Sequence, residues 1–208
     1  MTSAEMLSRL RMMLDRSAND GFLTDAGDLY PALTDGQKEA FKILYTKNPE
    51  DRRLQILMKD ATASAISVNY VAMPADMWEN YLLVASWAKV SGQDKKYCDI
   101  KVYNKELQYI LDNSYKTPVT SRPLAYIKST TALGNRIYFE PSGSSSDYEF
   151  TYLTIPTDID ASTQPQITDS LRYAVVLFAF QSILRKQKMF ERADAELKNF
   201  IGLVNDAG

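Results

Sequence analysis

The apolar run at 173–180 constrains the fold of this chain more than any other segment. It is the longest uninterrupted apolar run among the 208 residues, and it is far too short to cross a bilayer. The surrounding residues predict a helix over about 169–186, with Thr168 as its N-cap. Because the run is apolar on nearly all sides of that helix, the helix needs neighbours on nearly every side.

A last helix with one apolar stripe is predicted directly after it. No Gly or Pro separates the two helices, so they form either one bent helix or a hairpin that turns tightly at 187–189. The stripe consists of Phe190, Ala193, Leu197, Phe200, Ile201 and Val204.

The N-terminal part of the chain also follows a helical period. Apolar residues at the i, i+3, i+4 spacing predict an amphipathic helix over 4–17. Thr24 is a suitable N-cap for a short helix, which Pro31 is expected to interrupt. Thr34 and Gln37 have the spacing of a capping box, so a second helix is expected to start there.

The pattern changes between about 60 and 160, where alternating apolar and polar residues predict strands. The clearest alternation places Tyr148, Phe150 and Tyr152 on one side of a strand. The segment at 81–90 fits a strand or a helix, and a strand is favoured. A polar loop is expected at 141–146. Other strands are expected at 66–70, 98–103, 124–128 and 136–140, with a turn at 134–135 and a short helix after Asn104.

The order of these elements predicts an α+β fold. Neither helical end has enough apolar partners alone, so 1–59 and 161–208 are expected to form one helical bundle. The β-rich segment 60–160 is then an insertion between the two halves of that bundle.

The residue types that most enzymes use are scarce in this chain. It has no histidine, which removes the commonest general base and metal ligand. No glycine spacing matches a phosphate-binding loop. Its single cysteine, Cys98, lies among apolar residues and is interpreted as a packing residue. We therefore expect no catalytic residue, no cofactor and no metal.

Two groups of charged residues remain as alternatives. Asp147 and Glu149 share one face of a predicted strand, so they are either a solvated face, an inter-subunit contact or the carboxylate pair of a glycan hydrolase. Arg185, Lys188 and Arg192 lie at the junction of the last two helices. They either stabilise a helix C-terminus or contact an acidic subunit or nucleic acid.

Short motifs along most of the chain resemble the head-to-tail adaptor, or connector ring, proteins of tailed, podovirus-like bacteriophages. In that family an aromatic-x-[Ser/Thr]-Asp start follows a first amphipathic helix, as Phe22-Leu23-Thr24-Asp25 does here. The segment 70–78, which contains Pro74-Ala75-Asp76-Met77-Trp78, is similar to the family's strand that ends in a Leu-Pro-x-Asp-aromatic turn. The motifs occur in the same order in the chain as in that family. They lie at 22–30, 33–39, 70–78, 122–126, 135–141, 148–156, 167–180 and 193–204.

The resemblance implies a structural virion protein. Members of that family form homo-oligomeric rings, commonly dodecamers, that bind the portal protein at the capsid vertex and receive tail or other neck proteins. Double-stranded DNA passes through the lumen without sequence recognition. The implied location is the virion neck, after assembly in the host cytoplasm. No signal peptide or membrane contact is expected. The formal net charge of −2 agrees with the absence of a DNA-reading surface.

Candidate inter-subunit contacts follow from the tyrosine-rich sheet, the polar loop and the last two helices, because rings need a heterologous interface that closes on itself. The alternatives are another neck or tail-completion protein, a generic interaction module, or a carboxylate-pair glycan hydrolase. The candidate contacts are Tyr138, Ser144, Tyr148, Tyr152, Phe178, Arg185, Lys188, Phe190 and Arg192.

Overall fold

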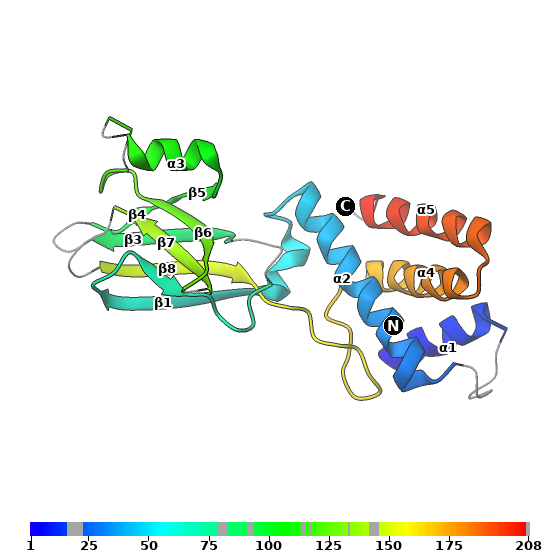
Figure 1. The fold of residues 1–208 in the computed structure, drawn as a ribbon. Helices are drawn as coiled ribbons and strands as arrows, with labels where there is room; N and C mark the ends of the chain where they lie inside the picture. The colour runs from blue at the N-terminus through cyan, green and yellow to red at the C-terminus, as the bar shows by residue number, and fades with distance from the viewer. Residues whose placement is uncertain are drawn as a thin grey trace. The chain divides into compact units, whose positions relative to one another are not determined.

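The chain folds as two compact units in the computed structural model, and the α+β prediction is confirmed (Figure 1). One unit joins Met1–Ile56 to Pro156–Gly208, and the other is Leu57–Ile155. The sequence had placed these boundaries at 60 and 160. The structure describes residues 1–15, 23–78, 83–90, 94–113, 115–116, 118–132, 134–141 and 146–206.

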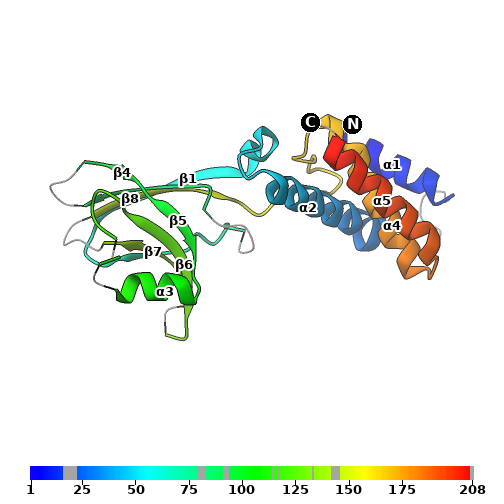
Figure 2. The ribbon, with the colours of Figure 1, turned by 90° about the horizontal axis from the view of Figure 1, so that it is seen from above.

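The first unit is a helical bundle built from both ends of the chain. Helix α4 (Asp169–Lys186) contacts α1 (Ser3–Met13), α2 (Tyr30–Lys47) and α5 (Phe190–Asp206), and these helices lie around it in Figure 2. This arrangement explains the apolar run, because most of its side chains lie between helices. The buried residues of α4 are Leu171, Ala174, Val175, Val176, Leu177, Ala179, Phe180, Gln181, Ile183 and Leu184.

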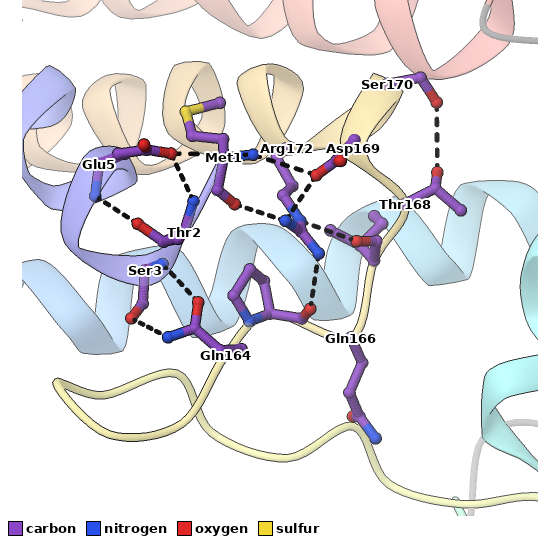
Figure 3. Close-up of polar contacts among 12 residues, drawn as sticks. Met1, Thr2, Ser3, Glu5, Gln164, Gln166, Thr168, Asp169, Ser170 and Arg172 are labelled. Atoms are coloured by element: carbon purple, nitrogen blue, oxygen red, sulfur yellow. Dashed lines mark hydrogen bonds and ion pairs between the residues drawn. The ribbon is translucent and has the colours of Figure 1, made fainter.

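Helix α1 is fixed against the start of α4 by polar contacts at its first turn. Thr2 and Glu5 form a capping box: the N–H of Glu5 donates to Thr2 Oγ1 (3.2 Å), and the N–H of Thr2 donates to Glu5 Oε2 (2.7 Å). Arg172 donates to the carbonyl of Met1 (2.5 Å) and pairs with Asp169 (2.5 Å), as Figure 3 shows. The two helices therefore begin side by side.

The predicted interruption at Pro31 is wrong. The π-helical turn η1 (Asp25–Leu29), with Thr24 as its N-cap as predicted, runs directly into α2, and Pro31 lies in the first turn of α2, where proline fits. Thr34 and Gln37 therefore lie inside the helix and not at its start. Their buried side chains bind the returning chain: Ile159 N–H donates to Thr34 Oγ1 (2.8 Å), and Gln166 N–H donates to Gln37 Oε1 (2.8 Å).

The last two helices form a hairpin, which resolves the alternative that the sequence left open. The chain turns after Lys186, and Lys188 adopts a left-handed conformation with φ of 63°. The N–H of Met189 donates to the carbonyl of Leu184 (2.9 Å), which closes the turn. The predicted first helix, by contrast, ends at Met13 and not at residue 17; residues 16–22 lie outside the described part.

The second unit contains two four-stranded sheets. One has the order β1 (Met58–Ile66), β8 (Ser146–Leu153), β3 (Ala85–Val90), β4 (Lys96–Tyr97). The other has the order β2 (Tyr70–Ala72), β7 (Gly134–Glu140), β6 (Leu124–Thr130), β5 (Asp99–Val102). All named pairs are antiparallel except β5 and β6, which are parallel and are joined through α3 (Lys105–Asp112).

An apolar core fills the space between the two sheets. Phe139 of β7 stacks on Tyr148 of β8, with ring centroids 4.0 Å apart. The alternation predicted for β8 is confirmed, because Tyr148, Phe150 and Tyr152 all point into this core. The other face of the second sheet is covered by α3 through a smaller cluster of Leu107, Leu124 and Tyr126.

Two predictions in this unit, one of a strand and one of a turn, are wrong. The segment 66–70 is not one strand, because β1 ends at Ile66, a bend occupies 67–69, and β2 begins in the other sheet at Tyr70. The predicted turn at 134–135 lies inside β7, where Gly134 has φ of 66°. In the segment 81–90, β3 begins at Ala85, and residues 79–82 lie outside the described part.

Helix α2 approaches α4 closely at Gly36, and this contact can be tested with two alanine variants. A Cβ at Gly36 would lie 2.8 Å from the carbonyl oxygen of Val175, so we expect Gly36→Ala to lower the free energy of unfolding by about 1–3 kcal/mol. Gly202 in α5 has open space around it, so Gly202→Ala should raise that free energy by about 0.5–1 kcal/mol. Urea denaturation measures both. Equal effects of the two variants would contradict the packing described here.

Candidate interaction surfaces

The structure brings several of the predicted contact residues together at the turn of the α4–α5 hairpin. We call Arg185, Lys188, Met189, Phe190 and Arg192 the hairpin tip; all five are exposed. Phe190 exposes 59% and Met189 43% of their surface, so two adjacent large apolar side chains are available to a partner at the tip. Met189 was not predicted, although it stands next to Phe190 in the sequence.

The arginines of the hairpin tip are held in place by neighbouring side chains. Arg185 pairs with Asp194 of α5 at 2.6 Å. The guanidinium of Arg192 lies over the ring of Phe180, 5.0 Å from its centroid. The tip is therefore a preorganised surface with apolar residues in the middle and cations around them.

Phe178 and Tyr138 occupy half-buried positions in different units. Phe178 packs edge to face on Phe200, with ring centroids 5.0 Å apart, so much of its ring joins α4 to α5. Tyr138 stacks on Tyr126 at 5.3 Å and lies beside Tyr70 at 5.5 Å, in a row of tyrosines across the second sheet. Ser144 lies outside the described residues.

Tyr148 and Tyr152 were wrongly predicted as inter-subunit contacts. They expose 0% and 2% of their surface because both point into the core between the sheets. Their hydroxyl groups are also used internally, since Tyr152 donates to Asp76 Oδ1 (2.9 Å) and Tyr148 contacts the carbonyl of Val68 at 3.4 Å. The alternation correctly predicted that these tyrosines lie on the same face of β8. It could not predict which face of the strand is buried.

Asp147 and Glu149 line a shallow hollow of about 360 Å³ on the outer face of the first sheet, together with Trp87, Lys89, Asp94 and Lys95. Glu149 forms an ion pair with Lys95, whose ammonium also lies 5.3 Å from the centroid of Trp87. A carboxylate pair that hydrolyses glycans needs a substrate cleft with an apolar wall beside the acid, whereas five of the six lining residues here are charged. This geometry gives no support to a carboxylate-pair hydrolase.

The interpretation of Cys98 as a packing residue agrees with its position. Its side chain is fully buried in the core between the sheets, and this burial raises the pKa of the thiol to about 11. The thiolate, which is the nucleophilic form, is therefore scarce at neutral pH. Among the described residues, no group of three or more Cys, Asp or Glu side chains is arranged to hold a metal ion.

A groove on the bundle with a mixed apolar and charged lining was not predicted from the sequence. Its polar lining residues are Arg9, Glu196, Lys198, Asn199 and Asp206. It consists of two adjoining hollows of about 450 and 540 Å³ that share Met13 and Tyr173. Met12, Leu177 and Leu203 extend it, and Met12 exposes 71% of its surface. We call this surface the bundle groove. Its lining residues come from α1, α4 and α5, which are far apart in the sequence or separated by a turn, so no single segment indicates it.

A second hollow that the sequence did not indicate lies where α3 meets β5 and β6. It has a volume of about 460 Å³, and we call it the edge hollow because β5 is the last strand of its sheet. Its lining combines apolar residues with three exposed cations, Lys101, Lys116 and Arg122. The signal in the sequence is the basic and apolar composition of 115–124.

The burial of Cys98 predicts its chemical reactivity. In the native protein we expect Ellman's reagent to modify Cys98 at least about 100-fold more slowly than in urea, because the thiol is both inaccessible and protonated. A cysteine introduced at exposed Ser129 of β6 is the control, and the Ser129→Cys variant should release one equivalent of thiolate rapidly. Equal native rates at the two cysteines would refute the burial.

Comparison of the sequence with protein-family models and with curated proteins gave no match. Within the described residues, no helix combines the length and the apolar composition that a bilayer crossing requires. The function is therefore argued from the hairpin tip, the bundle groove and the edge hollow.

Proposed function

We propose that this chain is a non-enzymatic subunit of a homo-oligomeric ring that joins the portal at the capsid vertex to the tail of a bacteriophage. The collinear motifs that resemble head-to-tail adaptor proteins support this proposal. So does the order of the elements, a bundle made of both chain ends with a β-rich unit between them. The ring leaves a lumen for double-stranded DNA.

The observation that carries the proposal is the presence on one bundle of two different surfaces that expose apolar side chains among charged ones. The hairpin tip presents Phe190 and Met189, and the bundle groove presents Met12, Tyr173 and Leu203. From Tyr173 to the tip, α4 rises by roughly 20 Å at 1.5 Å per residue, so the tip cannot fill the groove of its own chain. A contact from tip to groove between copies is heterologous, and such contacts form a ring when the rotation between neighbouring copies closes on itself.

The formal net charge of the chain fits a ring through which DNA passes better than a protein that recognises DNA. The formal net charge is −2, so no protein-wide attraction to phosphate holds the duplex in place. The cations at the hairpin tip are partly used within the chain, by Asp194 and by the ring of Phe180. These features suit a subunit whose contacts are with proteins.

Native mass spectrometry and negative-stain microscopy, with and without portal protein, test the proposal. We expect closed rings of one copy number, at least when portal is present. Phe190→Glu and Tyr173→Glu should each prevent ring formation, since each places a charge in an apolar contact. Mixing the two variants should give dimers, because one intact tip and one intact groove remain between them.

Ile201→Glu is the matched control, because Ile201 is also exposed on α5 but lines neither surface. It should leave the rings intact. A single-copy species under all conditions would contradict the proposed function. Binding to portal without ring formation would favour the alternative of another neck protein.

A further inference from the structure

The edge hollow has an apolar floor and a basic rim. Leu107 of α3 and Leu124 of β6 form the floor and expose only 2% and 6% of their surface. Lys101, Lys116 and Arg122 stand at the rim and are exposed. A hollow of about 460 Å³ with this lining fits an apolar side chain flanked by negative charge.

The rim carries more positive charge than its neighbours neutralise. Its lining includes three cations and one carboxylate, Asp99. Among the described residues, none of the three cations has a carboxylate oxygen within 4.0 Å. The ammonium of Lys116 lies instead over the ring of Tyr109, 5.1 Å from its centroid. The unbalanced charge attracts an anionic ligand.

Strand β5 offers backbone hydrogen bonds beside this hollow. Asp99 N–H donates to the carbonyl of Pro123 (2.9 Å), towards β6, whereas Cys98 N–H donates to Ser86 (2.9 Å) in the opposite direction. Because the direction alternates along a strand, the N–H groups of Ile100 and Val102 point away from β6. No described strand pairs with this side of β5. An extended peptide can satisfy these groups by adding a strand.

Exposed apolar residues lie on β5 and in the lining of the hollow. Val102 at the end of β5 exposes 65% of its surface, Val119 exposes 54%, and Tyr115 exposes 98%. A nucleic acid would use the cations and Tyr115 but would leave the backbone edge and the two valines without partners. A peptide uses all of them, so a peptide fits the observations better.

We propose that the edge hollow binds an extended acidic peptide segment of a partner protein. The segment pairs its backbone with Ile100 and Val102, places an apolar side chain on Leu107 and Leu124, and offers carboxylates to the rim cations. This site lies within the β-rich unit, and it does not depend on ring formation by the bundle.

Fluorescence anisotropy tests the site with a labelled pool of synthetic peptides in which acidic and branched apolar residues alternate. We expect micromolar binding by the full chain and no binding of a matched pool with lysine in place of the acidic residues. Lys101→Glu and Arg122→Glu should each weaken binding at least about 10-fold. Lys105→Glu, at an exposed position of α3 outside the lining, should change it less than about 2-fold.

Val102→Pro tests the strand addition, because it removes an outward N–H and no bond to β6. It should weaken binding at least about 10-fold without lowering the melting temperature, whereas Lys101→Pro should destabilise the unit. If Val102→Pro fails to fold, the two charge reversals decide. No binding of the acidic pool, equal binding of the basic pool, or tighter binding of single-stranded oligothymidylate would each overturn the proposal.

Discussion

The burial of α4 is the constraint on which the bundle depends. A helix that is apolar on nearly every side has to be surrounded, and α1, α2 and α5 supply that cover. Two of these helices come from sequence far from α4, so the fold has to return to the N-terminal segment after the β-rich unit. The close approach of α2 at Gly36 and the buried bonds of Gln37 to the returning chain follow from this requirement.

The core of the β-rich unit, unlike that of the bundle, consists largely of aromatic side chains. Phe139, Tyr148, Phe150 and Tyr152 fill the space between the two sheets, and the tyrosine hydroxyls reach polar partners at its margin. Tyr148 and Tyr152, which were predicted as interface residues, belong to this core, whereas Tyr97, Tyr109, Tyr115 and Tyr173 are exposed. The hairpin tip, the bundle groove and the edge hollow each expose apolar side chains beside charged ones.

Local periodicity predicted the helices at both ends and the alternation of β8, because those signals lie within a few turns of sequence. Strand pairing was not predictable, since Met58 pairs with Leu153 across almost the whole unit. The same limit explains the error at Tyr148 and Tyr152, whose burial depends on the opposite sheet. Neighbours in sequence such as Phe190 and Arg192 could be identified, whereas the bundle groove and the edge hollow combine residues from separate elements.

The central claim is that both chain ends form one self-sufficient bundle and that 57–155 is an insertion. Replacing 57–155 by a short Gly/Ser linker tests it most directly, with circular dichroism and thermal unfolding as the measurements. The account predicts a helical spectrum and a single cooperative transition, because every helix that covers α4 is retained. A chain that is unfolded, or that loses helicity gradually on heating, would contradict it.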